Sequence, residues 1–215
     1  FESTLNPETR RSGGMHYTSI ENIHKVIDPL FLDDLKKEFK EIQAVTVRRT
    51  KEKRLDEFQN KLASLTFLDP ACGSGNFLTE TYLSLRRLEN EVIRERVGGQ
   101  ITLGEVHNPI KVSIQQFYGI EINDFAVTVA KTALWIAESQ MLEETKNIVY
   151  GFNDDFLPLK TYVNITEGNA LRIDWNEVVP VERLSYIMGN PPFVGYSYQS
   201  ESQKKDIENV YVDEN

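Results

Sequence analysis

Two short motifs in this sequence combine residue types that could carry out group transfer. The first places an acid and then two glycines ahead of a helical pattern, in the run Asp69-Pro-Ala-Cys-Gly-Ser-Gly75. The second joins a polar amide to two prolines and an aromatic ring, in the run Asn190-Pro-Pro-Phe193. Because glycine lets the backbone turn sharply and approach a ligand closely, the first motif predicts a loop that binds a nucleotide-like cofactor.

The residues around the glycine loop restrict the kind of cofactor. A Walker loop needs Gly-Lys and then Ser or Thr, whereas Gly75 is followed by Asn76, and the dinucleotide fingerprint needs a glycine where this sequence has Leu78. The carboxylates of Asp69 and Glu121 could instead bind an ammonium group and the hydroxyls of a ribose. S-adenosylmethionine has a ribose and an amino group but no phosphates, so it fits this pattern best.

The second motif has the groups that methyl transfer to a planar amine requires. The side-chain oxygen of Asn190 and the backbone carbonyl of Pro191 can accept hydrogen bonds from an exocyclic amine, which draws the nitrogen lone pair out of conjugation with the ring. The proline rings of Pro191 and Pro192 stiffen the turn, and Phe193 offers a flat face for an unstacked base. The alternative interpretation is a structural Pro-Pro turn with one buried aromatic.

The elements that must position these motifs belong to an open α/β sheet. Short apolar runs predict four strands, at 65–68, 117–122, 162–165 and 184–188. Helical patterns predict one helix from Asn76 to Gly98 and another from Asn123 or Asp124 to about Met141, the second apolar on almost every side and therefore deeply buried. Each motif follows a strand directly, and ligands bind at the carboxyl ends of parallel strands, so we expect one common site there.

Residues 1–64 form a predicted N-terminal helical segment that precedes the sheet. Thr18 or Ser19 could cap a helix, which we expect to end at Pro29 because proline disfavours the helical conformation in the residue before it. Helical periodicity then continues from 30 to 63. The last fifteen residues are polar and acidic, and they predict no contribution to the core.

Taken together, the two motifs resemble the first and fourth motifs of amino-directed DNA methyltransferases of the N6-adenine class. Three further runs are similar to the methyltransferase region of large bacterial type IIG/IIL restriction-modification proteins: Gly14-Met-His-Tyr-Thr-Ser19, the run 117–126 and the run 131–138. The similarity extends from about residue 5 to 205. It implies a Rossmann-like class I methyltransferase fold, S-adenosyl-L-methionine as the cofactor, and adenine N6 in DNA as the methyl acceptor.

The resemblance also implies a role for individual residues. Tyr17 and Thr18 would close over the methionine end of the cofactor, Glu121 would hold its ribose, and Ile122 would pack on its adenine. Asn169 would bind the adenine amino group, at a position where aspartate is common. The full expected set is catalytic Asn190, Pro191, Pro192 and Phe193, with cofactor-binding Tyr17, Thr18, Asp69, Ala71, Gly73, Gly75, Glu121, Ile122 and Asn169.

The composition excludes several other kinds of protein. With 215 residues, 40% of them hydrophobic and 27% charged, the chain has the make-up of an ordinary globular domain, and it contains no apolar run of membrane-spanning length. Its single cysteine, Cys72, excludes an internal disulfide, and we expect it to be a small packed residue rather than a nucleophile. The three histidines are not clustered, so no metal is predicted. These features suit the cytoplasm.

The net charge of −9 argues by itself against a free-standing DNA-binding protein, because phosphate contacts supply much of the affinity for DNA. Residues 1–64 hold 12 basic and 11 acidic residues, and the remainder holds 12 and 22. The implied fold has about seven strands, whereas only four are predicted here. We therefore expect residues 65–215 to be the N-terminal portion of a catalytic domain, truncated after Asn-Pro-Pro-Phe, with an exposed sheet edge and no activity on its own.

If the chain is such a fragment, its expected partners are the missing parts of the protein and the DNA substrate. The missing C-terminal methyltransferase half and a target-recognition domain would supply most of the phosphate-binding surface, and the substrate would be double-stranded DNA with a flipped adenine. Two other functions stay open. The chain could belong to a methyltransferase for protein glutamine or RNA, or it could hold the cofactor as a binding module without turnover.

Overall fold

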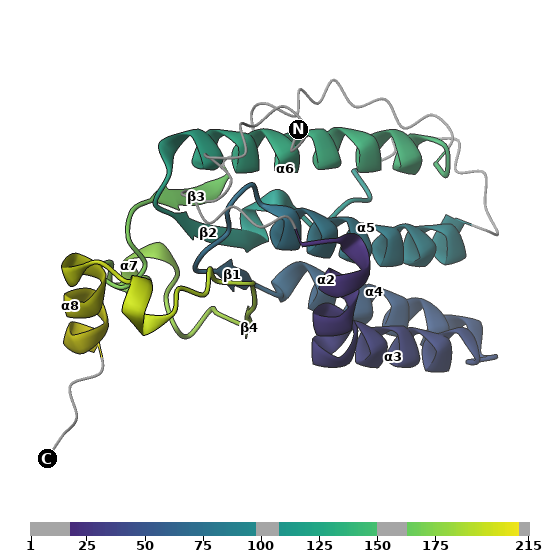
Figure 1. Ribbon diagram of the computed structural model, residues 1–215. Helices are drawn as coiled ribbons and strands as arrows, with labels where there is room; N and C mark the ends of the chain where they lie inside the picture. The colour runs from purple at the N-terminus through teal and green to yellow at the C-terminus, as the bar shows by residue number, and fades with distance from the viewer. Residues whose placement is uncertain (1–17, 98–107, 150–162, 211–215) are drawn as a thin grey trace, which may run out of the picture.

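The four predicted strands form a single parallel sheet in the computed structural model, which describes residues 18–97, 108–149 and 163–210. The strands are β1 (Phe67–Asp69), β2 (Phe117–Glu121), β3 (Asn164–Glu167) and β4 (Tyr186–Ile187). Their order is β3-β2-β1-β4, with parallel pairing throughout (Figure 1). The chain therefore moves outward from β1 to β3 and returns to the other side of β1. This reversal makes the carboxyl ends of β1 and β4 a topological switch point.

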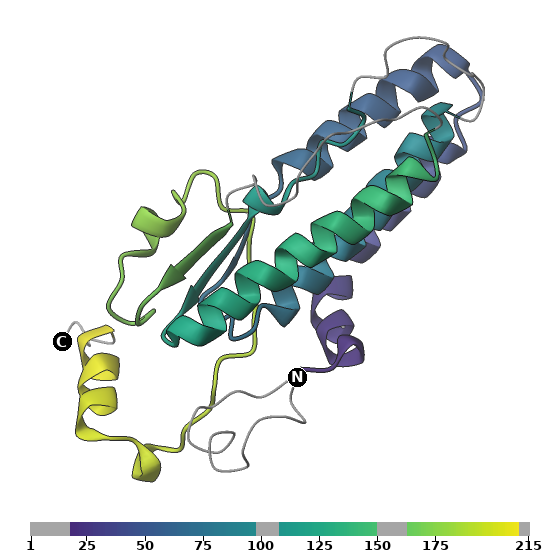
Figure 2. The ribbon, with the colours of Figure 1, turned by 90° about the horizontal axis from the view of Figure 1, so that it is seen from above.

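Side chains alternate between the two faces of the sheet and build a separate apolar layer on each. On one face Phe67 and Phe117 stack with ring centroids 5.2 Å apart, under the helices α5 (Asn76–Val97) and α6 (Asp124–Lys146). On the other face Leu68 and Ile120 pack against the segment around α7 (Trp175–Val178). Figure 2 shows α5 and α6 along one face and the short α7 on the other. The predicted α/β class is confirmed.

The helix α6 differs from its prediction in length and in burial. The side chain of Asn123 caps it by accepting a hydrogen bond from the Ala126 N–H, as predicted, but the helix continues past Met141 to Lys146. The expectation that it is buried on almost every side is wrong, because Phe125 and Ile136 are each 54% exposed. Small and apolar residues at helical spacing face the sheet and α5, namely Ala126, Ala130, Leu134, Ala137 and Met141.

The N-terminal helices pack into the same apolar cluster as the sheet. Their bounds are α2 (Ile20–Ile27), the π-helical turn η2 (Asp28–Leu32), α3 (Asp33–Gln43) and α4 (Arg48–Ser64). Ser19 caps α2, and this α-helix ends at Ile27, close to the predicted stop, but the chain continues as a π-helical turn that was not predicted. Pro29 lies in the first turn of η2, where the Asp33 N–H bonds to the Asp28 carbonyl and the wider turn carries the chain onward.

The segment after β4 contains a helix that the sequence pattern did not predict. After the short turn η5 (Tyr196–Tyr198), α8 (Glu201–Val210) contacts the segment that follows β3, where Asn169 and Arg172 donate hydrogen bonds to its Asp206 (Figure 1). Asp206 is its one buried residue, so polar contacts rather than an apolar stripe hold this helix. The remaining short element, η3 (Ile114–Gln116), leads into β2. In the described ranges, the helices are too short or too polar to cross a membrane.

Candidate active site

The loop after β1 has the conformation that its glycines predict. Gly73 and Gly75 adopt positive φ angles of 52° and 80°, which L side chains rarely adopt. A Cβ atom on Gly75 would lie 3.0 Å from the Cβ of Ala130 on α6, so this position also lacks room for a side chain. The Gly75 N–H donates to the Cys72 carbonyl at 2.8 Å and closes the turn. The chain therefore reverses directly into α5.

A carboxylate at the end of β2 ties this loop to the next strand. Glu121 accepts hydrogen bonds from the Gly73 N–H on Oε2 and from the Asn123 N–H on Oε1, each at 2.9 Å. The side chain is partly exposed, and each carboxylate oxygen can accept a further hydrogen bond. Glu121, the residue predicted to bind the ribose, thus lies against the predicted cofactor loop. Its carboxylate can still accept hydrogen bonds from a ligand.

A second carboxylate, Asp69, is buried beneath the same loop. Its residue is 2% exposed, and its Oδ1 accepts a hydrogen bond from the Ala71 N–H at 3.0 Å. Burial raises the pKa of this carboxyl to about 7, against the opposing effect of the Ala71 N–H, and the nearby Glu121 raises it further. Within the described residues the Ala71 N–H is its one hydrogen-bond donor. A cationic group would compensate this acid.

The turn after β4 meets the glycine loop at the switch point. Gly189 has a φ of 156°, and a Cβ atom on it would lie 2.8 Å from the Cγ of Asp69 and closer still to the carboxylate oxygen Oδ1. The strands β1 and β4 that lead into these two turns are paired, with Leu68 opposite Ile187. The next residue after Gly189 is Asn190, so the two motifs come together at one edge of the sheet.

The side chains of the Asn-Pro-Pro-Phe turn are open to solvent. The Asn190 Nδ2 donates to the Thr18 hydroxyl at 3.1 Å, which leaves the amide oxygen able to accept from another group. Pro191 and Pro192 are exposed, and Phe193 is 94% exposed. The buried aromatic of the alternative interpretation is therefore not found, because the Phe193 ring is exposed. An exposed ring beside a free amide oxygen is an arrangement that could receive a planar base.

The adenine side of the predicted site lies at the ends of β2 and β3. The Gly168 N–H donates to the Glu121 backbone carbonyl at 2.8 Å, which places Asn169 next to that strand end. Ile122 is 69% exposed, and Phe125 beside it is also exposed. The structure thus brings a carboxylate, an exposed apolar surface and an amide together, and their cofactor roles stay predictions.

Two expectations about other residues have different outcomes. Tyr17 lies outside the described residues, so its predicted role rests on the sequence. Cys72 is buried, its Sγ would lie 2.8 Å from a Cβ on Gly119, and burial raises the pKa of its thiol. The prediction that Cys72 is a packed residue is confirmed. In the described ranges, His, Cys, Asp and Glu side chains form no group that could hold a metal ion.

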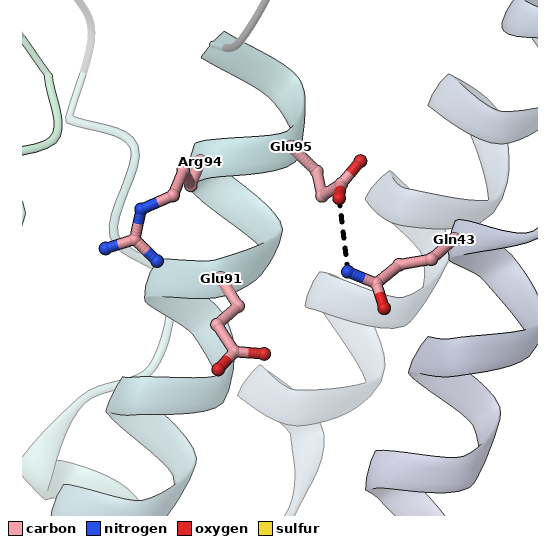
Figure 3. A pocket seen from close by; sticks show the side chains of 4 residues that line it. All are labelled: Gln43, Glu91, Arg94 and Glu95. Atoms are coloured by element: carbon pink, nitrogen blue, oxygen red, sulfur yellow. Dashed lines mark hydrogen bonds between the residues drawn. The ribbon is translucent and has the colours of Figure 1, made fainter.

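Two surface hollows lined by described residues lie away from this site. Gln43, Glu91, Arg94 and Glu95 line one of them, between the ends of α3 and α5, where the Gln43 Nε2 donates to the Glu95 Oε1 at 3.1 Å (Figure 3). A second hollow shares Arg94. Because α5 begins beside the glycine loop and rises about 1.5 Å per residue, Arg94 lies about 27 Å from its start. Neither hollow belongs to the candidate site.

Two residues that the sequence reasoning did not select contribute to the site. Gly189 precedes the second motif directly, and its need to be glycine follows from the neighbouring strand rather than from its own segment. Asp206 on α8 accepts a hydrogen bond from Asn169 at 2.9 Å. Gly189 could have been selected from the sequence, because it is a glycine directly before the Asn-Pro-Pro-Phe motif. Asp206 could not, because it lies in a polar segment that has no distinguishing pattern.

Comparison with known proteins gives a consistent result. The family model described as the DNA-methyltransferase domain of MmeI matches residues 45–215. The chain is 42% identical over 213 residues to DNA methyltransferase A of Bacillus subtilis (strain 168), which covers 98% of this chain and 23% of that protein. It is 34% identical over 74 residues to the adenine-specific methyltransferase PglX of Streptomyces coelicolor, which covers 34% of this chain and 5% of that protein.

One solved structure is similar over almost the whole chain. It is the type IIL restriction-modification enzyme MmeI in complex with DNA, with a TM-score of 0.87 and 41% identity. The match covers 99% of this chain and 27% of that protein. The chain therefore spans about a quarter of the length of these two relatives.

Proposed function

Because the chain belongs to the family of MmeI DNA-methyltransferase domains, we propose that it holds S-adenosylmethionine and activates the N6 amino group of adenine in DNA. The observation that carries this proposal is the contact between Gly189 and Asp69, which sets Asn190 beside the glycine loop. Methyl transfer needs the donor and the acceptor amine in one place, and this contact joins the two predicted subsites.

The side chains around the loop fit the cofactor, which when bound supplies a methyl group on a positively charged sulfur. Glu121 would accept hydrogen bonds from the ribose hydroxyls, and the exposed Ile122 would pack on the adenine base. The buried Asp69, with its single N–H donor in the described part of the chain, would be stabilised as an anion by the ammonium group. The backbone of Ala71, Gly73 and Gly75 would line the methionine side, and Tyr17 and Thr18 would close over it.

The turn after β4 would bind and activate the acceptor. The Asn190 side-chain oxygen and the Pro191 carbonyl would each accept a hydrogen bond from the amine, so that its lone pair leaves conjugation and points at the methyl group. Pro192 would stiffen this turn, and the exposed Phe193 ring would stack on a base that has left the duplex. Once the nitrogen has bonded to the methyl carbon, whose bond to sulfur breaks as the sulfur loses its charge, the methylated amine would release one proton to water.

The choice of adenine in DNA draws on both the motif and the relatives. The run Asn190-Pro-Pro-Phe193 resembles the fourth motif of the N6-adenine class. Among the relatives, one is named an adenine-specific methyltransferase and another was solved in complex with DNA. The DNA duplex and the remaining parts of a longer restriction-modification protein are the partners that this function would require.

The test is a transfer assay with the complete protein that the gene encodes. The protein is incubated with methyl-tritiated S-adenosylmethionine and genomic DNA, and the DNA is digested to nucleosides. We expect the label in N6-methyladenine. Label in protein glutamine or in RNA under parallel conditions, with none in DNA, would refute the proposal. Cofactor binding with no transfer to any acceptor would favour a binding module.

The variant Asn190→Ala tests whether the turn after β4 acts in methyl transfer and not in cofactor binding. Removal of the amide oxygen should lower transfer at least about a hundredfold, since an electrostatic contact to the reacting group is lost, while the Kd for the cofactor stays within about twofold. Asn209→Ala on the exposed face of α8 is the matched control and should behave as wild type. Equal loss of binding and transfer in Asn190→Ala would contradict this division of roles.

A further inference from the structure

The two sides of the Asn169 amide have partners that each fix its orientation. Its Nδ2 donates to the Asp206 Oδ2 at 2.9 Å, and its Oδ1 accepts from the Leu171 N–H at 2.9 Å. An ionised carboxylate can only accept a hydrogen bond, and a backbone N–H can only donate one. Both partners therefore require the nitrogen of the amide to face α8 and the oxygen to face the turn after β3.

Asp206 is itself held in place. Its Oδ1 accepts from the Arg172 Nε at 2.8 Å, and the Arg172 guanidinium also donates to the Ser202 hydroxyl at 3.1 Å. The Asp206 side chain is 9% exposed. The hydrogen bond from Arg172 lowers the pKa of the Asp206 carboxyl, so it is ionised at neutral pH. The acceptor that faces Asn169 is thus a fixed, charged group.

The amide that Asp206 holds lies at the predicted adenine end of the cofactor site. Asn169 follows Gly168, whose N–H bonds to the backbone carbonyl of Glu121. The exposed Ile122 comes directly after that glutamate. A carbonyl oxygen has two lone pairs, and the Leu171 N–H uses one of them. The Asn169 oxygen can therefore accept one more hydrogen bond from a ligand in this site.

We propose that Asp206 is a positioning residue, which makes the Asn169 amide present only its oxygen to the base of the cofactor and so selects a 6-amino purine over a 6-oxo purine. This inference rests on the proposed function, since it assumes that the base lies against Asn169. The 6-amino group of adenine donates hydrogen bonds, whereas the 6-oxo group of hypoxanthine accepts them. An asparagine that is free to rotate its amide could bind either one, and Asp206 removes that freedom.

The test compares two ligands that differ at position 6 of the purine and at the adjacent N1, which is an acceptor in adenine and an N–H donor in hypoxanthine. Kd values for S-adenosylhomocysteine and for its deaminated analogue, S-inosylhomocysteine, are measured by calorimetry with the complete protein. Wild type should prefer the adenosine form by at least about tenfold, because the wrong ligand leaves an unpaired polar group. The isosteric Asp206→Asn should bring this ratio down about tenfold, since its own amide can either donate or accept.

Two further variants distinguish a positioning role of Asp206 from a nonspecific effect of the substitution on charge or folding. Glu208→Gln removes the same charge from the exposed side of the same helix and should keep the wild-type ratio. Asn169→Asp combined with Asp206→Asn restores a fixed acceptor at position 169 and should recover the preference. If Asp206→Asn weakens both ligands equally and the ratio is unchanged, the inference is overturned while the proposed function stands. Wild-type protein that binds neither ligand would refute both.

Discussion

Gly189 lies against the carboxyl group of Asp69, so the turn after β4 and the loop after β1 meet with no room for a side chain between them. Asp69 ends β1, whereas Gly189 follows the neighbouring parallel strand β4, which the chain enters much later in the sequence. Because this contact lies at the switch point of the sheet, it fixes the distance between the glycine loop and Asn190. The spacing of the two predicted subsites therefore depends on Gly189, which has no predicted contact with the cofactor or with the base.

The first prediction concerns the smallest change at this contact. Gly189→Ala would push a methyl group into the Asp69 carboxyl and would impose a φ of 156° on an L residue. Overpacking of this kind costs about 1–3 kcal/mol, and a misplaced Asn190 would align the acceptor poorly. We expect the complete protein to lose methyl transfer at least about tenfold, with a lower unfolding temperature.

Gly195→Ala is the matched control for this variant. A Cβ atom on Gly195 would lie 3.6 Å from the Tyr198 ring, which is ordinary van der Waals contact. Transfer and unfolding temperature should therefore stay at wild-type values. If the two alanine variants behave alike, the packing of Gly189 on Asp69 does not set the geometry of the site.

The second prediction concerns the link between the loop and β2. Glu121→Gln keeps the shape of the side chain but leaves one acceptor where two N–H groups, those of Gly73 and Asn123, now donate to a carboxylate. Hydrogen bonds to charged groups contribute about 1.5–3 kcal/mol, so the Kd for S-adenosylmethionine should rise at least about tenfold. Transfer at saturating cofactor should change little, because Glu121 does not contact the acceptor.

The neighbouring strand supplies the control. Glu167 is the register partner of Glu121 on β3 and is exposed, so Glu167→Gln makes the same change of charge at the adjacent strand end. It should leave the Kd unchanged. A Kd that rises equally in both variants would indicate a general effect of charge and not a ribose ligand.

The sequence predicted most of the elements because their signals are local. The strand before Asp69, the cap at Asn123 and the glycine turn each depend on residues within a few positions. The prediction for α6 overestimated its burial because composition alone does not show which side of an apolar helix lacks a covering layer. The π-helical turn that contains Pro29 was not predicted, because such a turn has no simple sequence pattern.

The parts of the site that could not be predicted depend on strand order and on polar docking. Gly189 must be glycine because β4 lies beside β1, which no local pattern encodes. The helix α8 has no apolar stripe, and Asp206 reaches Asn169 and Arg172 through contacts between distant segments. Motifs thus locate the site, whereas the residues that position the motif side chains become visible only in three dimensions.

The third prediction concerns the buried carboxyl group of Asp69. Burial raises the pKa of Asp69 to about 7, so the folded protein binds this proton more tightly than the unfolded chain does. The effect of Asp69 on stability is therefore most favourable below its ordinary pKa near 3.8, and it becomes less favourable as pH rises from there to about 7. Asp69→Asn cannot ionise and should remove this dependence from the unfolding temperature measured across pH 5 to 8.

Cofactor affinity should depend on pH in the opposite direction. The ammonium group of the cofactor would bind the ionised form of Asp69. Below about pH 7 only the fraction of the protein with Asp69 ionised can therefore bind the cofactor tightly. The affinity for S-adenosylmethionine should therefore rise about tenfold per pH unit from pH 5 and level off near 7, as measured by calorimetry of the complete protein. Asp69→Asn should bind weakly at every pH. An affinity in wild type that is flat across this range would show that Asp69 does not meet the ammonium group.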